Sequence, residues 1–185
     1  NAVVWVKLFD MGKTIGMYFG NNSVKNASSG DDTFLLFDDF SEGFDSVKWS
    51  AYPTTPTVSN GILQLENRYI WTKDDFGENV VLMARENVKS TENVMFGFSI
   101  MPLTDVDFGD CLLPYIRVSS LNNVFYLRTG ISGTSRTENN SYADYSNSWI
   151  TYEIKRAPGK IELWANDDNL VLSNSTSIPS VPLQV

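Results

Sequence analysis

Tyrosine and arginine alternate on two neighbouring β-rich runs of this 185-residue chain. Strand alternation places Tyr115 and Arg117 on one face of the first run, and Tyr126 and Arg128 on one face of the second. If the runs pair across the turn at 119–123, the four side chains form one patch. An exposed aromatic face with a few polar groups suits a sugar, and the planar guanidinium donates to hydroxyl or carboxylate partners. The patch predicts carbohydrate binding; the alternative is an ordinary solvated sheet.

Three aspartates lie close together in a Gly-containing loop, namely Asp105, Asp107 and Asp110. Hard oxygen ligands at short spacing are what Ca²⁺ requires. The loop lacks the remainder of an EF-hand, so a plain acidic turn is the alternative. The acidic pairs at 38–39 and 167–168 are further candidates. The sequence therefore predicts either no cofactor or Ca²⁺.

Four Asn-x-Ser/Thr triplets fall in polar stretches, at Asn21, Asn26, Asn139 and Asn174. Such triplets arise by chance in loops rich in Asn and Ser. Together they favour a glycosylated extracellular surface.

Composition excludes several kinds of chemistry. The chain has no histidine, so it cannot build a Ser-His-Asp or Cys-His site or a His-ligated zinc site. Its single cysteine, Cys111, cannot form an internal disulfide and is expected to be a small buried thiol. A formal net charge of −8 argues against nucleic acid or anionic membrane as a partner. No apolar run has the 18 or more residues of a membrane span.

Period-two alternation and turn residues predict an all-β protein. The expected strands are 34–37, 61–65, 68–72, 80–85, 94–101, 112–119, 124–129, 149–156, 161–165 and 170–173. Two apolar runs at 2–8 and 14–19 predict a hairpin that extends from Ala2 to Phe19. Both ends of the sequence lie in apolar pattern, so we expect a fragment or processed product.

Two stretches resemble a known class of domain. The run FLLFDDF with Trp49, and the closing series WITYEIK, GKIELW and LVLS, resemble concanavalin-like (laminin-G-like) sandwiches of extracellular proteins. VWVKL followed by KTIGMYFGN resembles the end of an uncharacterised domain family of prokaryotic surface proteins. The resemblance implies an antiparallel concanavalin-like jelly-roll sandwich at 34–185, lacking its last strand, after the tail of another β-domain at 1–33.

Glycoside hydrolysis is the enzymatic function that this resemblance implies. It requires two carboxylates flanking a cleft, one of them with a raised pKa. The β-glucanase signature of the fold, Glu-x-Asp-x-x-Glu, is absent from the sequence. Glu153 and Glu162 could face one another across a hairpin, although a solvated cross-strand pair is the alternative. We therefore expect a protein that is not an enzyme.

The resulting hypothesis is a secreted or cell-surface binding or adhesion module whose ligand is a glycan or a surface protein. The rival hypothesis is a structural subunit of a surface layer or filament, assembled by strand exchange. In that case the hairpin from Ala2 to Phe19 would pair with a neighbouring domain or subunit, because an isolated two-stranded hairpin is marginally stable.

Overall fold

The computed structural model describes residues 4–8, 12, 14–16, 23, 27–87, 94–99, 115–121, 124–131, 135–142, 148–166 and 169–185. The chain divides into two compact units, which we treat separately. The smaller comprises Asn1–Phe44 and Thr57–Gln64, and the larger comprises Asp45–Pro56 and Leu65–Val185. The expected domain division at 33/34 stays a prediction.

A single helical turn, α1 (Gly30–Thr33), belongs to the smaller unit. Ser29 caps this turn by accepting a hydrogen bond from the backbone N of Asp32 at 3.2 Å. The strand predicted at 34–37 is wrong, because these residues form bends instead. In a strand Phe34 and Phe37 would point to opposite faces. Here their rings stack with centroids 5.8 Å apart, and a Cβ at Gly30 would lie 2.1 Å from the Phe37 ring.

The smaller unit also contains a tight hairpin. Strands β2 (Thr57–Ser59) and β3 (Ile62–Gln64) pair antiparallel. Asn60 and Gly61 join them with φ values of 52° and 70°. Positive φ at both central residues is what a type I′ turn demands, so the turn predicted at these two residues is confirmed.

The described part of the predicted N-terminal hairpin does not form a strand. Residues 4–8 and 14–16 have no regular secondary structure. Val4, Trp5, Val6 and Leu8 are 61%, 57%, 50% and 51% exposed. Half of the predicted second strand, residues 17–19, lies outside the described residues. In this single chain, residues 4–8 therefore present an apolar surface to solvent.

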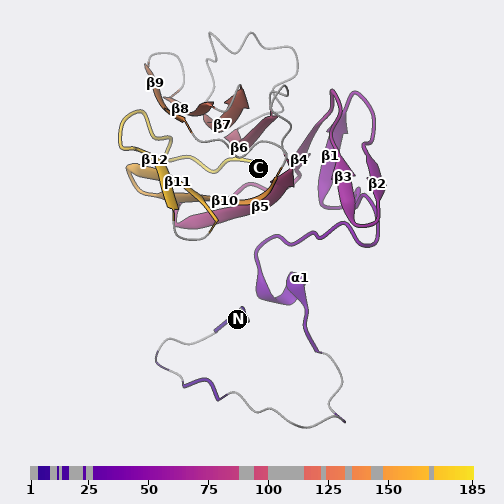
Figure 1. Ribbon diagram of the computed structural model, residues 1–185. Helices are drawn as coiled ribbons and strands as arrows, with labels where there is room; N and C mark the ends of the chain where they lie inside the picture. Colours follow the sequence, from indigo (N-terminus) through magenta and orange to yellow (C-terminus); the bar gives the residue numbers. More distant parts are fainter. Residues whose placement is uncertain are drawn as a thin grey trace. The chain divides into compact units, whose positions relative to one another are not determined.

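Two four-stranded sheets form the larger unit, and Figure 1 shows them stacked over one another. The β10 sheet has the order β12-β11-β10-β5, with β5 (Val80–Asn87), β10 (Trp149–Ala157), β11 (Lys160–Ala165) and β12 (Asn169–Asn174). The β8 sheet has the order β6-β7-β8-β9, with β6 (Val94–Ser99), β7 (Tyr115–Leu121), β8 (Val124–Ile131) and β9 (Ser135–Tyr142). A separate antiparallel pair consists of β1 (Trp49–Tyr52) and β4 (Tyr69–Thr72). Neighbouring strands in both sheets run antiparallel.

The core lies between the two sheets. Alternate residues of β10 and β11 are buried there, namely Ile150, Tyr152, Ile154, Ile161, Leu163 and Ala165. The β8 sheet contributes Phe98 and Leu127, which are 3% and 0% exposed. The Phe96 ring lies 5.3 Å from the Tyr152 ring, which joins the two layers. Each large apolar side chain buried in this way contributes about 1.5–3 kcal/mol.

An arginine closes one end of this core. Arg156 follows the same alternation as Ile154 and is 1% exposed. Its guanidinium donates to four backbone carbonyls, those of Phe76, Gly77, Pro179 and Val181, at 2.6–3.1 Å. Burial lowers the pKa of Arg156. This side chain therefore holds two loops against β10 through hydrogen bonds that water would otherwise make.

The C-terminal segment returns to the sandwich, although no final strand was expected in this chain. Leu183 exchanges two backbone hydrogen bonds with Phe76, and Gln184 exchanges two with Ser99, all at 2.7–3.0 Å. The backbone N of Thr72 donates to the Val185 carbonyl at 2.9 Å. Leu183 is fully buried. Two isolated β-bridges thus attach the C-terminal segment to the sandwich in place of a longer closing strand.

The predicted fold class is confirmed as an all-β antiparallel jelly-roll sandwich. The two sheets contain eight described strands, and the sequence predicted seven of them. The eighth, β9, was missed because its sequence, SRTENNSY, has one large apolar residue. Among the described residues, no helix has the length and apolarity that a membrane crossing requires.

Candidate functional site

Tyr126 and Arg128 lie on the side of β8 that faces away from the core. The intervening Leu127 and the following Thr129 are both 0% exposed, whereas Tyr126 and Arg128 are half-buried. The Arg128 guanidinium lies over the Tyr126 ring, 5.2 Å from its centroid. A cation in this position is attracted by the electron density of the ring face. Strand alternation therefore brings together this half of the predicted patch.

The register between β7 and β8 places the backbone positions of the other half. Arg117 stands opposite Arg128, and Tyr115 stands opposite Gly130. Opposite positions in an antiparallel pair belong to the same side of the sheet. The structure describes the backbone of β7 but not its side chains. At the level of register, the four predicted positions lie on the same side of the sheet.

Small residues occupy the next strand of the same sheet. Gly97 of β6 stands opposite Arg117, and Ser99 stands opposite Tyr115. Both are partly exposed, while Phe98 between them is buried in the core. The β6 positions beside the patch therefore add little side-chain bulk to this part of the sheet.

A buried polar network fixes β8 beneath the patch. The Thr129 hydroxyl donates to the Thr176 carbonyl at 2.9 Å and accepts a bond from Asn174 Nδ2 at 2.7 Å. Asn174 Oδ1 in turn accepts from the backbone N and the hydroxyl of Thr176, both at 2.9 Å. These bonds hold the core side of β8 to the segment after β12, so Tyr126 and Arg128 stand on a braced strand.

The four predicted glycosylation sites differ in how much of their structure is described. Asn174 is 5% exposed, and its Nδ2 atom, to which a glycan would attach, is engaged with Thr129. The folded chain therefore offers no access for modification there. Asn139 stands on β9, where the structure describes only the backbone. Asn21 and Asn26 lie outside the described residues, and glycosylation at these three positions stays a prediction.

The calcium hypothesis is also untested, because Asp105, Asp107 and Asp110 lie outside the described residues. In the part of the chain that the structure describes, no group of three or more His, Cys, Asp or Glu side chains could hold a metal ion. Asp38 Oδ1 accepts from the backbone N of Phe40 at 2.8 Å, and Asp39 Oδ1 from that of Ser41 at 3.0 Å. These two carboxylates therefore stabilise a turn.

The two glutamates proposed to face each other do not pair. In the register of β10 and β11, Glu162 stands opposite Lys155, and Glu153 stands opposite Trp164. Glu153 forms an ion pair with Lys155 at 3.1 Å, and Glu162 forms one with Lys160. Hydrogen bonds from Lys160 and Trp164 lower the pKa of Glu162, which is the opposite of what a general acid needs.

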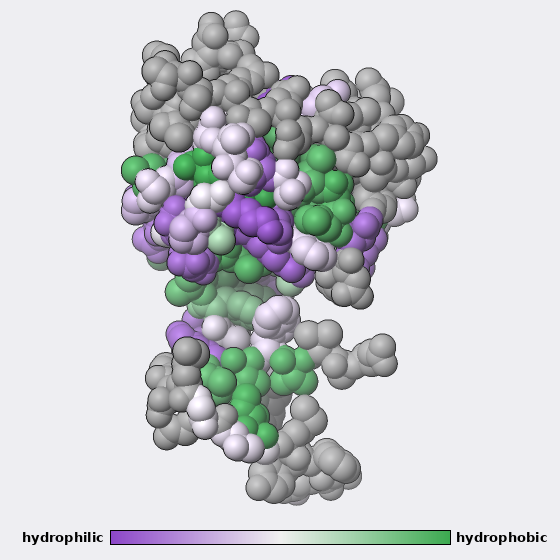
Figure 2. All heavy atoms as spheres, turned by 90° about the vertical axis from the view of Figure 1, so that its left-hand side faces the viewer, coloured by the Kyte–Doolittle hydropathy of each residue, from purple (hydrophilic) through white to green (hydrophobic). Residues whose placement is uncertain are grey.

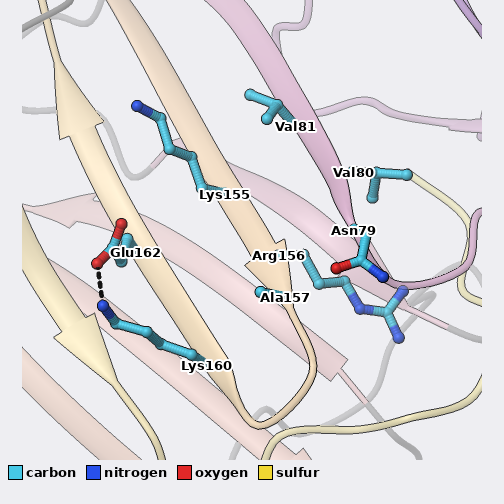
Figure 3. Close-up of a pocket in the computed structure, with 8 residues that line it drawn as sticks. All are labelled: Asn79, Val80, Val81, Lys155, Arg156, Ala157, Lys160 and Glu162. Carbon is cyan, nitrogen blue, oxygen red and sulfur yellow. Dashed lines mark ion pairs between the residues drawn. The ribbon is translucent and has the colours of Figure 1, made fainter. Parts of the chain in front are cut away.

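A hollow of about 230 Å³ lies beside these ion pairs, on the opposite sheet from Tyr126 and Arg128. Its lining residues are Asn79, Val80, Val81, Lys155, Arg156, Ala157, Lys160 and Glu162. Figure 3 shows Lys155 and Arg156 extending to opposite sides of β10, and it marks the ion pair between Lys160 and Glu162. Each of the two lysines has a glutamate partner, and the guanidinium of Arg156 is already bound to four backbone carbonyls. We therefore place the candidate site on the β8 sheet.

Sequence reasoning missed a second arginine–aromatic contact, on the outer face of the β10 sheet. The Arg85 guanidinium lies 5.3 Å from the ring centroid of Trp149, which is 44% exposed. Alternation predicts an outward position for each, but only the pairing of β5 with β10 makes them neighbours. Figure 2 shows hydrophilic and apolar residues intermixed on the face of the protein that it presents.

One carboxyl group on β5 lies against the interior of the sandwich. Glu86 follows the alternation of Val80, Leu82 and Ala84, and its Oε2 atom is inaccessible and has no hydrogen-bond partner in the described structure. Although the residue as a whole is half-buried, loss of solvation raises the pKa of Glu86 to about 7. This carboxyl is therefore largely protonated at slightly acidic pH.

The N-terminal region matches a family of proteins. Residues 1–52 fit the family described as a domain of unknown function (DUF2341). The match covers the region in which the sequence resembles an uncharacterised domain family. No curated protein sequence matches the chain.

The sandwich is similar to solved structures of glycoside-cleaving enzymes. A Bacillus licheniformis β-glucanase is 15% identical, with a TM-score of 0.61 over 80% of each chain. A native glycosidic hydrolase is 19% identical, with a TM-score of 0.59 over 77% of this chain and 76% of its own. A prokaryotic β-1,3-1,4-glucanase (lichenase) from a mouse hindgut metagenome is 16% identical, with a TM-score of 0.55 over 76% and 78%. At these identities the likeness establishes the fold.

These likenesses overturn the prediction that the chain is not an enzyme. That prediction relied on a missing strand motif and on the absence of histidine. The fold, however, is one that glycoside hydrolases use. Glycoside hydrolysis requires suitably placed carboxyl groups, and it does not require a histidine. Neither premise therefore excludes catalysis.

Proposed function

We propose that this chain is a secreted or cell-surface protein that binds a glycan on the β8 sheet. The observation that carries the proposal is the contact between Tyr126 and Arg128 on the side of β8 away from the core. A sugar presents an apolar ring face and a rim of hydroxyl groups. The Tyr126 ring suits the former, and the Arg128 guanidinium suits the latter.

Two features of the surroundings support this proposal. The braced underside of β8 keeps the pair in place, so little conformational entropy is lost on binding. The small residues Gly97 and Ser99 leave space beside it. The names of the similar structures refer to enzymes that cleave glycosides, which supports a sugar ligand for a chain of the same fold.

The test is binding of the full chain to a panel of immobilised polysaccharides, with Tyr126→Ala as the variant. Loss of an aromatic anchor should weaken binding by about 1–3 kcal/mol. Trp149→Ala is the matched control, because Trp149 also contacts an arginine but on the other sheet. Equal affinity of Tyr126→Ala and the wild type, or a larger loss in Trp149→Ala, would refute the proposed site.

Glycoside hydrolysis is a second candidate function, favoured by the fold likeness. Among the described carboxyl groups Glu86 has a raised pKa, although its Oε2 atom is buried against the interior of the sandwich. A general acid works best when its pKa lies near the working pH. Incubation with the same polysaccharides, followed by a reducing-end assay, tests for turnover. Loss of that turnover in Glu86→Gln would support this function, whereas unchanged turnover would exclude Glu86 as its acid.

A further inference from the structure

We propose that the glycan bound on the β8 sheet carries carboxylate or sulfate groups; this inference rests on the proposed function. The four strands of this sheet contain three arginines and one glutamate, namely Arg117, Arg128, Arg136 and Glu138. They therefore carry an excess of two positive charges in a chain whose formal net charge is −8. A local excess of this sign attracts anions to the sheet.

The register concentrates this charge at the candidate site. Arg117 stands directly opposite Arg128, and both β7 and β8 are inner strands of the sheet. Like charges at directly opposite positions destabilise a sheet. Glu138 of β9 stands opposite Arg128 on its other side and supplies one compensating charge. The three positions together carry one net positive charge, which favours an anionic ligand over a neutral one.

The residue types narrow the ligand further. Arginine presents a planar fork that matches carboxylate and sulfate geometry, whereas a neutral sugar offers only hydroxyl groups. Tyr126 supplies the apolar surface for a sugar ring next to the same arginine. An anion without a sugar would make no use of that ring. Together these features favour a uronate or a sulfated sugar over both a neutral glycan and a simple anion.

The experiment compares paired polymers on the full wild-type chain. Polygalacturonate is set against its methyl-esterified form, dextran sulfate against dextran, and polyglutamate serves as an anion without sugar. We expect at least one acidic polysaccharide to bind about ten-fold more tightly than its neutral counterpart. We also expect that affinity to fall as salt rises. The two pairs distinguish carboxylate from sulfate as the recognised group.

The remaining outcomes distinguish failure of this inference from failure of the proposed glycan binding. Equal binding of acidic and neutral forms would overturn this inference but leave the proposed glycan binding intact. Absence of binding to every polysaccharide would overturn both. Polyglutamate bound as tightly as the acidic polysaccharides would show attraction to any polyanion, which overturns recognition of an acidic sugar.

Variants that keep the charge separate the guanidinium fork from simple attraction. Arg117→Lys and Arg128→Lys should each weaken binding of the acidic polysaccharide about ten-fold, because lysine cannot make the planar paired contact. Arg85→Lys is the matched control on the other sheet and should bind like the wild type. Melting curves of all three variants show that the fold is retained. Unchanged affinity in both Arg117→Lys and Arg128→Lys would overturn the inference.

Discussion

Both sheets of the sandwich place an arginine over an aromatic ring, and at nearly the same distance. Arg128 lies 5.2 Å from the Tyr126 centroid on the β8 sheet, and Arg85 lies 5.3 Å from that of Trp149 on the β10 sheet. The contacts differ in their surroundings. On the outward positions of the β10 sheet two glutamates offset two lysines, so Arg85 is the one excess cation, whereas the strands of the β8 sheet carry three arginines and one glutamate. An arginine–aromatic contact alone therefore does not define a site, because the charge around it matters as well.

The largest expected effect on stability concerns Arg156, which is buried between the two sheets. Arg156→Met should lower the free energy of unfolding by about 3 kcal/mol or more, because four carbonyl groups lose their shared donor. Arg85→Met, an exposed arginine on the same sheet, should change it by about 0.5 kcal/mol at most. Urea denaturation of both variants provides the measurement. Similar losses in the two would contradict the distinction between a core arginine and a surface arginine.

Glu86 should make stability depend on pH. Below pH 4.5 its carboxyl is protonated in both states, given an unfolded pKa of 4.5 and a folded pKa of about 7. As pH rises between these values, the unfolded chain releases its proton while the folded chain keeps it. Stability therefore falls over this window and stays low above it. Glu86→Gln should remove this fall and stabilise the fold by up to about 3 kcal/mol at pH 8, with little change at pH 4.

Thermal melting of wild type and Glu86→Gln at several pH values checks this prediction. Glu162→Gln is the control on the outer face of the same sheet, because its carboxyl is paired with Lys160 and its pKa is lowered rather than raised. A constant difference in melting temperature between wild type and Glu86→Gln from pH 4 to pH 8 would show that Glu86 does not titrate in this window.

The intermediate effect concerns the brace beneath the candidate site. Asn174→Ala should cost about 1–2 kcal/mol of stability, because Thr129 loses a donor and Thr176 loses an acceptor. Ser173→Ala, at an exposed position on the same strand, should cost about 0.5 kcal/mol or less. If the brace also fixes the ligand contact, glycan affinity should fall in Asn174→Ala alone. Equal glycan affinity in both variants would restrict Asn174 to a purely structural role.

Alternation was enough to predict most strands, because each buries one face against the core. Ile150, Tyr152 and Ile154 show this pattern, and so does the outward placement of Tyr126 and Arg128. The strand predicted at 34–37 was inferred from a short apolar run bounded by turn residues, and such a run does not show that two of its rings stack on each other.

Features that depend on pairing could not be predicted from the sequence. The contact of Arg85 with Trp149 requires the register between β5 and β10. Arg156 follows the buried alternation of its strand, but its four carbonyl partners come from loops distant in sequence. Glu86 follows the inward alternation of its strand, but its burial and hence its raised pKa depend on how the sandwich packs around it. Long-range geometry therefore determined the features that local patterns missed.

The smallest effect on stability is expected from the exposed apolar segment, which tests the rival structural hypothesis. Val6 is 50% exposed and belongs to the smaller unit, so Val6→Lys should leave the melting of the sandwich unchanged. If residues 4–8 pair as a strand with another copy, the wild type should associate as its concentration rises. A lysine in the segment should prevent this association, because charged side chains oppose edge pairing. Val47→Lys is the control, since Val47 is 80% exposed in the larger unit and should associate like the wild type. Sedimentation velocity over a range of concentrations distinguishes these cases. A wild type that remains monomeric at every concentration would end the strand-exchange hypothesis for this chain.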